Sequence, residues 1–139
     1  MNHSTKRELA RAAAFRSELR RFLRRTEIVA SQAGLTPERY DLLLMIQAGV
    51  DADAPLRVTD LCGSLQLRQT AVTENVKRAV EAGLIGRRPS PDDRRATLLY
   101  LTEEGERRLW SAYEGLRGDR ADLRRALDDL DLRLRAASR

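Results

Sequence analysis

Four arginines crowd a short segment in the middle of this 139-residue chain. Arg87 and Arg88 precede a Ser-Pro-Asp-Asp stretch, and Arg94 and Arg95 follow it. A guanidinium is planar and permanently charged, and its forked donors match the oxygens of a phosphate or the edge of guanine. Like charges this close repel one another unless an anion or a nearby carboxylate compensates them. The segment therefore predicts an anion-binding hairpin; the alternative is a solvated hairpin that pairs its own charges.

Two acidic residues, Asp92 and Asp93, stand directly before Arg94 and Arg95. A carboxylate close to an arginine can orient its guanidinium through a charge-assisted hydrogen bond, so that the side chain extends away from its own strand. We therefore expect these aspartates to hold a neighbouring arginine in an extended position.

The composition fits this prediction and restricts the class of protein. Lys and Arg total 26 against 21 Asp and Glu, a net charge of +5 that favours a polyanionic partner. The single cysteine, Cys62, leaves no intrachain disulfide and is expected to be a buried structural thiol rather than a redox sensor. No stretch approaches the roughly 18 consecutive apolar residues that span a bilayer. We expect a single cytoplasmic domain with no membrane partner.

Helical spacing and capping residues predict four helices before the arginine hairpin. Thr5 begins a capping-box pattern, Thr36 precedes a proline at a helix start, and Thr59 is a third candidate cap. Gly83 is expected to end the fourth helix. The expected ranges are residues 5–33, 36–49, 59–65 and about 69–82.

The periodicity changes after Gly83. Residues 85–89 and 95–101 read as two strands around a turn at residues 90–93. Thr102 is expected to cap the next helix, and Gly118 to break it before Asp119 caps a last helix over residues 119–137. Leucines spaced four, three and four form a narrow seam on that last helix, which predicts packing against another helix: Leu123, Leu127, Leu130 and Leu134.

The order of the middle elements predicts a mainly α fold with a small β-hairpin, a winged helix-turn-helix. In the helix at about 69–82, apolar residues on one side would hold it to the domain: Val72, Val76, Ala79 and Val80. The other faces carry residue types that read bases or grip phosphates: Gln69, Thr70, Thr73, Glu74, Lys77 and Arg78. An ordinary solvated face is the alternative, and the basic hairpin at about 85–101 favours nucleic acid.

The middle of the chain resembles a known protein family. The stretch from Arg57 to Gly105 is similar to the MarR (multiple antibiotic resistance regulator) family of bacterial winged-helix transcription factors. The family's signature of Asp, any residue, Arg, five residues and then Leu-Thr corresponds to Asp93, Arg95, Leu101 and Thr102. The segment GLTPERYDLLLMI resembles the family's second helix, so the resemblance covers about residues 34–110.

The resemblance implies one domain over residues 1–139 and a homodimer formed by helices 5–33 and 119–137. The winged lobe, residues 36–102, would bind double-stranded DNA at a pseudo-palindromic operator, as a transcriptional regulator that is expected to repress. A winged-helix module that binds a protein and no DNA is the alternative.

The resemblance also implies roles for single residues. Thr70, Ala71 and Thr73 would face the major groove, Arg95 with its neighbour Arg94 would enter the minor groove, and Asp93 would position Arg95. Together with the residues read from the pattern, the expected DNA-binding set is Arg68, Gln69, Thr70, Ala71, Thr73, Glu74, Lys77, Arg78, Arg87, Arg88, Asp93, Arg94 and Arg95.

Two positions depart from the family's pattern. Arg68 stands where a capping Ser or Asp is usual and cannot accept a hydrogen bond, so we expect either a shifted start of the helix or a contact between Arg68 and a phosphate. Glu74 stands where a basic residue is common. A carboxylate facing DNA is costly unless it accepts from a cytosine amino group, so Glu74 is either a candidate specificity residue or a sign that this face lies farther from the bases.

The family implies a small aromatic or anionic effector between the terminal helices and the winged lobe. The residues that would line this site are Arg16, Arg20, Tyr40 and Trp110. Clusters of His, Cys and Asp with metal-ligand spacing are absent from the sequence, so neither a metal nor another cofactor is expected. A nucleophile paired with a base is absent as well, and an enzyme is not expected.

Overall fold

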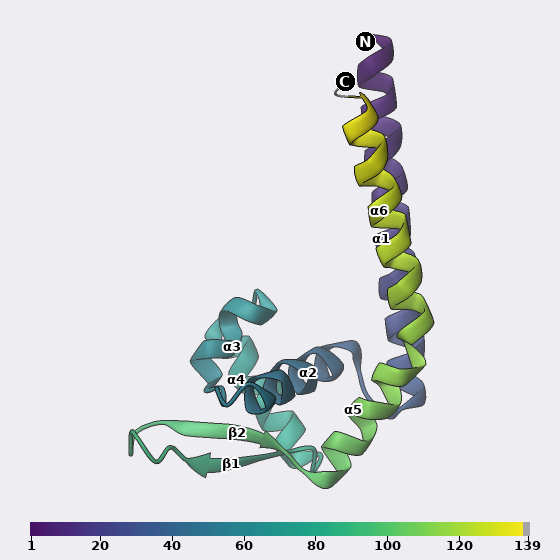
Figure 1. Ribbon diagram of the computed structural model, residues 1–139. Helices are drawn as coiled ribbons and strands as arrows, with labels where there is room; N and C mark the ends of the chain where they lie inside the picture. Colours follow the sequence, from purple (N-terminus) through teal and green to yellow (C-terminus); the bar gives the residue numbers. More distant parts are fainter. Residues whose placement is uncertain (138–139) are drawn as a thin grey trace. The chain divides into compact units, whose positions relative to one another are not determined.

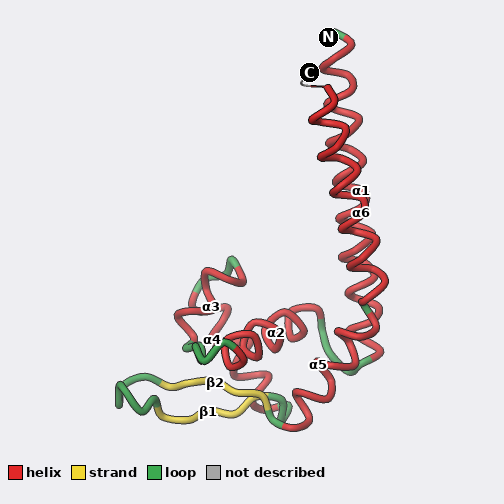
Figure 2. Tube along the Cα trace, viewed as in Figure 1, coloured by secondary structure: helices red, strands yellow, loops and turns green. Residues whose placement is uncertain are grey.

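The fold is seen in a computed structural model, which describes residues 1–137 apart from the side chains of residues 131–134 and 137. These residues form helices and one two-stranded antiparallel hairpin (Figures 1 and 2), so the predicted mainly α fold with a small β-hairpin is confirmed. The elements are α1 (His3–Gln32), α2 (Pro37–Asp51), α3 (Val58–Leu65), α4 (Gln69–Glu81), β1 (Ile85–Pro89), β2 (Thr97–Leu101), α5 (Glu103–Gly115) and α6 (Arg117–Ala137).

The chain divides into two compact units. We call residues 30–113 the winged unit, and residues 1–29 together with the chain from residue 114 onward the helical unit. The winged unit contains α2, α3, α4, the hairpin and most of α5, whereas the helical unit contains most of α1 and all of α6.

The core of the winged unit is built from the apolar faces of α2, α3 and α4 and from the hairpin. Its largest fully buried side chains are Leu42, Leu43, Ile46, Leu61, Val72, Val76, Leu84 and Leu99. Burying one side chain of this size contributes about 1.5–3 kcal/mol. Because α4 and the hairpin share this core, packing fixes the position of α4 relative to the root of the hairpin.

The hairpin is in register from Ile85 opposite Leu101 to Pro89 opposite Thr97. Its second strand is also anchored on its other side, because the N–H of Leu99 donates to the carbonyl of Leu56 at 3.1 Å. The segment before α3 therefore holds β2 against the winged unit, while the far end of the hairpin extends away from it (Figure 1).

Several predicted helix boundaries are confirmed. Thr36 accepts a hydrogen bond from the N–H of Arg39 at 3.2 Å, as expected of the residue that caps α2. Gly34 and Gly83 follow α1 and α4 with φ angles of +78° and +75°, the left-handed conformation that glycine adopts most easily.

Two predicted helix starts are wrong by one or two residues. The first helix begins at His3, because Asn2 rather than Thr5 supplies the cap: its Oδ1 accepts from the N–H of Thr5 at 2.8 Å. The third helix begins at Val58, before the expected cap Thr59. There the carboxylate of Asp60 reaches back to the N–H of Arg57 at 2.9 Å and satisfies the helix N-terminus.

The break between the last two helices also differs from the prediction. It lies at Leu116, whereas Gly118 lies inside α6 and Asp119 in its first turn. Leu116 is buried and its carbonyl accepts from the N–H of Arg120 at 2.9 Å. Packing of a leucine therefore determines where the helices join. A glycine in an exposed helix costs only about 1 kcal/mol and does not have to end it.

In the helical unit α1 and α6 run antiparallel. Arg25 pairs with Asp119 at 3.2 Å, and farther along the pair Ala14 and Leu130 line one small cavity. Large apolar side chains remain exposed here, with Leu9 at 53% and Leu23 at 55%. Of the predicted leucine seam, Leu123 and Leu130 are half-buried, Leu127 is exposed, and the side chain of Leu134 lies outside the described residues. Within residues 1–137, no helix is long and apolar enough to cross a membrane.

Candidate nucleic-acid interface

Helix α4 turns one face to the core and the other to the surface. Val72, Val76 and Ala79 are fully buried, and Val80 is half-buried. The residues predicted to face outward are all exposed: Gln69, Thr70, Thr73, Glu74, Lys77 and Arg78. Ala71 is half-buried. The predicted division of faces is confirmed, and it gives α4 a continuous polar surface.

The N-terminus of α4 has no side-chain cap. Arg68 precedes the helix with an extended backbone, and its exposed side chain makes no capping hydrogen bond. Gln66, in the link before it, adopts the left-handed conformation with φ of 54°. An uncapped helix N-terminus offers free N–H groups and a partial positive charge. With the Arg68 guanidinium beside it, this end of α4 is suited to a phosphate.

Glu74 does not stand alone on this face. Its carboxylate accepts from Nε of Arg78 at 3.2 Å, one helical turn along α4. Sequence reasoning treated the two residues separately, although their i,i+4 spacing indicates such a pair. Both side chains are more than half exposed, and pairs of this kind contribute only about 0.2–0.5 kcal/mol. The pair can therefore open when a base or a phosphate competes for either partner.

The tip of the hairpin is a tight turn that Asp93 organises. The carbonyl of Asp93 accepts from the N–H of Ala96 at 3.1 Å, and its side-chain Oδ1 accepts from the N–H of Arg95 at 2.9 Å. Aspartate favours the first position of such turns because its carboxylate can bind the backbone two residues on. Arg94 and Arg95 consequently occupy the two central positions of the turn.

This geometry corrects two expectations. The turn was predicted at residues 90–93 with a strand from residue 95, but the strand begins at Thr97 and the turn spans residues 93–96. Asp93 does contact Arg95, but through the backbone N–H instead of the guanidinium. The reason is proximity. The carboxylate of Asp93 reaches the N–H two residues on with little loss of rotamer freedom, whereas the guanidinium of Arg95 would have to fold back to reach that carboxylate.

The four hairpin arginines differ in their surroundings. Arg94 and Arg95 are exposed at the tip, and among the described residues their side chains have no hydrogen-bond or ion-pair partner. Arg88 lies over the ring of Tyr100, 6.0 Å from its centroid, whereas Arg87 belongs to the opposite face of β1. Sequence reasoning missed Tyr100, because only the strand register brings it diagonally across from Arg88.

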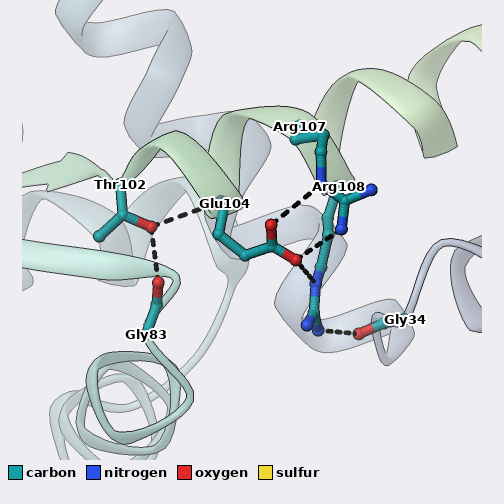
Figure 3. Close-up of polar contacts among 7 residues, drawn as sticks. Gly34, Gly83, Thr102, Glu104, Arg107 and Arg108 are labelled. Atoms are coloured by element: carbon teal, nitrogen blue, oxygen red, sulfur yellow. Dashed lines mark hydrogen bonds and ion pairs between the residues drawn. The ribbon is translucent and has the colours of Figure 1, made fainter.

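Thr102 joins α4 and the hairpin to α5 (Figure 3). Its hydroxyl donates to the carbonyl of Gly83 at 2.6 Å and accepts from the N–H of Gly105 at 3.1 Å, while its own N–H donates to the carbonyl of Leu84 at 3.0 Å. The expected cap of the next helix is thus confirmed. The bonds to Gly83 and Leu84, which tie α5 to the end of α4 and the root of the hairpin, were not expected.

A second network lies on the first turns of α5 (Figure 3). Glu104 accepts from Nε and Nη2 of Arg107 at 2.9 and 2.6 Å and from Nε of Arg108 at 2.7 Å. Arg108 also donates from Nη1 to the carbonyl of Gly34 at 2.9 Å. The hydrogen bonds from Arg107, and then from Arg108, lower the pKa of Glu104 to about 2. The network links α5 to the turn before α2.

The residues predicted to bind an effector are distributed over both units. Arg16 and Arg20 lie on α1, in the helical unit. In the winged unit Tyr40 is buried, whereas Trp110 is 61% exposed and stacks on Tyr113 with ring centroids 5.5 Å apart. The effector site formed by these residues stays a prediction.

Two further expectations concern reactive groups. Cys62 was expected to be a buried structural thiol; it is half-buried and donates from Sγ to the carbonyl of Val58 at 3.7 Å, and its structural role stays a prediction. Throughout residues 1–137, no three His, Cys, Asp or Glu side chains that the structure describes are grouped to hold a metal ion.

A family model and several known proteins are similar to this chain. A family model described as "MarR family" matches residues 33–96. An uncharacterised protein of Mycobacterium tuberculosis is 35% identical over 108 residues, which cover 77% of this chain and 72% of the relative.

Two solved structures share the fold. The MarR family transcription regulator SP03579 superposes with a TM-score of 0.74 at 20% identity, covering 98% of this chain and 87% of the other. The transcriptional repressor CouR, bound to a 23-mer DNA duplex, superposes with a TM-score of 0.69 at 24% identity, covering 100% of this chain and 99% of the other. The matched segment contains α2, α3, α4 and the tip of the hairpin, and with these likenesses it shows that the chain belongs to the MarR family of transcription regulators.

Proposed function

We propose that this protein is a sequence-specific transcriptional repressor that binds an operator in double-stranded DNA, in the cytoplasm, as a homodimer. One observation carries the proposal: the exposed polar face of α4 and the unpaired arginines at the hairpin tip belong to one packed unit. The CouR structure, which holds a DNA duplex, supports this assignment by its fold.

In this proposal α4 enters the major groove. Thr70 and Thr73, exposed on the first turns of the helix, are placed to contact base edges, and Ala71 to contact a thymine methyl group. Arg68 and the open helix N-terminus would bind one phosphate, and Lys77 another. Glu74 and Arg78 would exchange their mutual hydrogen bond for contacts with bases or phosphates.

The hairpin tip would reach the adjacent minor groove. Arg95 and Arg94 stand at the apex of the turn, where a guanidinium can extend into the negative potential of a narrow groove. Asp93 contributes by fixing the turn, so that the arginines are displayed before DNA arrives. Arg87 and Arg88, nearer the root, would contact the flanking phosphates.

The homodimer is proposed from the helical unit. The apolar side chains of Leu9, Phe15, Leu23 and Leu127 are exposed on α1 and α6, which fits a surface that a second copy covers. A two-fold dimer presents two α4 helices to half-sites about 34–36 Å apart. A small aromatic or anionic effector near Arg16, Arg20, Tyr40 and Trp110 would release the operator by favouring a dimer with another spacing.

Substitution of Arg95 tests the proposal. The binding measurement is fluorescence anisotropy at fixed salt, with a labelled duplex of the sequence that the wild-type protein selects from a random pool. Arg95→Ala is expected to weaken binding by about 1–3 kcal/mol with little change in melting temperature. Arg124→Ala, an exposed arginine on α6, is the matched control and should bind as the wild type does. Equal affinity of the Arg95 variant and the wild type would refute the proposed role of the hairpin tip.

A further inference from the structure

A cavity of about 410 Å³ opens between α2 and α5, wholly inside the winged unit. Leu44 and Leu109 form its apolar wall, and Trp110 and Tyr113 form an aromatic one. The lining residues of each helix repeat at i, i+3, i+4 and i+7, so each helix presents one continuous face to the cavity. Cavities that bind drug-sized molecules have about 300–1,000 Å³. The space therefore suits one small aromatic molecule.

The tryptophan of the aromatic wall is largely exposed to solvent. Trp110 is 61% exposed although it is the largest apolar side chain of the molecule, and it is stacked on Tyr113 at an interplanar angle of 25°. A ring pair held in this way offers a π-face to a ligand. Tryptophan is also the side chain whose face attracts a cation most strongly.

The charge of the lining is negative. Asp51 and Glu106 lie at the cavity, and its lining also includes Tyr113 and the neutral amide of Gln47, which donates to Asp51 at 2.9 Å. Among the described residues, no Lys, Arg or His side chain lines this space. Asp51 is also the last residue of α2, where the helix dipole adds partial negative charge. An anion in this cavity would meet repulsion from both charged residues of the lining, Asp51 and Glu106.

We propose that this cavity binds a lipophilic aromatic cation, with its rings against Trp110 and Tyr113 and its positive charge toward Asp51 and Glu106. Cation–π attraction and charge complementarity favour this class of ligand over the anionic effector that the family resemblance suggests. Any consequence of this binding for operator release rests on the proposed function. The binding itself is a property of the winged unit alone and can be measured without DNA.

Trp110 is the only tryptophan of the chain, so intrinsic fluorescence reports on this cavity directly. The probes are tetraphenylphosphonium and tetraphenylborate, which have nearly the same shape and opposite charge. We expect saturable quenching of Trp110 by the phosphonium, with an affinity at least tenfold higher than for the borate. Equal or tighter binding of the borate, or no saturable quenching by the phosphonium, would overturn the proposal. Absence of quenching in a dimer that shields Trp110 would overturn it too, because a second copy would then be the occupant.

Substitutions confirm the site of binding. Asp51→Asn and Glu106→Gln are each expected to weaken phosphonium binding about two- to fivefold, the effect of removing one exposed ion pair. Glu103→Gln, on the same helix but outside the lining, is the matched control and should leave binding unchanged. Unchanged affinity in both cavity variants would contradict the assignment. Anisotropy of labelled DNA is read separately, so a protein that fails to bind DNA can still support or refute the cavity proposal.

Discussion

The spacing of Asp93 and Arg95 has a physical cause at the level of single atoms. A carboxylate at the first position of a tight turn accepts the N–H two residues on, and this bond is 2.9 Å long here. This bond helps to fix the backbone of the turn that carries Arg94 and Arg95. Among the described residues, the side chains of these two arginines form no ion pair. The acid therefore shapes the turn and does not neutralise the cations that the turn displays.

This role predicts different effects for two substitutions of Asp93. Asp93→Asn keeps an oxygen that can accept from the N–H of Arg95 and should retain most of the DNA affinity. Asp93→Ala removes the acceptor, loosens the turn and should weaken binding by about 1 kcal/mol. Anisotropy with the selected duplex measures both, with Asp92→Ala as the control. If the Asn variant bound as poorly as the Ala variant, the negative charge itself would be required, as the sequence suggested.

Glu104 gives the molecule a defined response to acid. The hydrogen bonds from Arg107 and Arg108 lower the folded-state pKa of this carboxyl from 4.5 to about 2. A lowered folded-state pKa stabilises the fold above pH 4.5, and this contribution is lost as pH falls toward 2.

The corresponding prediction compares the wild type with Glu104→Gln. The wild type should be the more stable protein at neutral pH, and the difference in free energy of unfolding should shrink as pH is lowered from about 4.5 to about 2. Urea unfolding at several pH values measures it, and Glu103→Gln serves as the control on the same helix. A difference that did not change with pH would mean that Glu104 stabilises α5 without its charge.

At the level of elements, the function depends on how α4, the hairpin and α5 are joined. Gly83 ends α4, β2 returns beside β1, and Thr102 then bonds back to Gly83 and Leu84. One hydroxyl thus links the end of α4 to the start of α5. The Leu-Thr pair in the family's signature has a structural explanation here, because Leu101 is buried next to this junction.

Thr102 is therefore expected to tolerate serine and not valine. Thr102→Val removes the bond to Gly83 and the cap of α5, and should lower the free energy of unfolding by about 1–3 kcal/mol. Thr102→Ser keeps the hydroxyl and should be close to the wild type in thermal unfolding. Thr97→Val, at an exposed position of β2, controls for the change of side chain. A loss of stability in the Ser variant with none in the Val variant, which keeps the methyl group, would assign the role of Thr102 to packing of that methyl and contradict a role for the hydroxyl.

The elements also show what sequence can predict. The faces of α4, the caps at Thr36 and Thr102 and the helix stops at Gly34 and Gly83 were predictable because each depends on a few neighbouring residues. The helix starts at His3 and Val58, and the join at Leu116, depend on which of several nearby side chains reaches the backbone or the core. The contact between Arg88 and the ring of Tyr100 depends on the strand register, and no register was predicted from the sequence.

At the scale of the whole molecule, the proposal assigns DNA binding to the winged unit and dimerisation to the helical unit. The winged unit carries the polar face of α4, the arginine tip and the acidic aromatic cavity. The helical unit exposes Leu9 and Leu23, whose burial in a dimer would remove apolar surface from water. In the proposed dimer, specific binding at two half-sites would need both units, because one α4 would contact too few base pairs to select a site in a genome.

Selection of bound DNA from a random pool by the wild-type protein tests this account most directly. DNA binding, base readout and dimerisation all contribute to the outcome. We expect enrichment of an inverted repeat whose half-sites lie about 10 base pairs apart, one turn of the double helix. No enriched sequence, or a single half-site without its inverted copy, would contradict the proposed homodimeric, sequence-specific regulator.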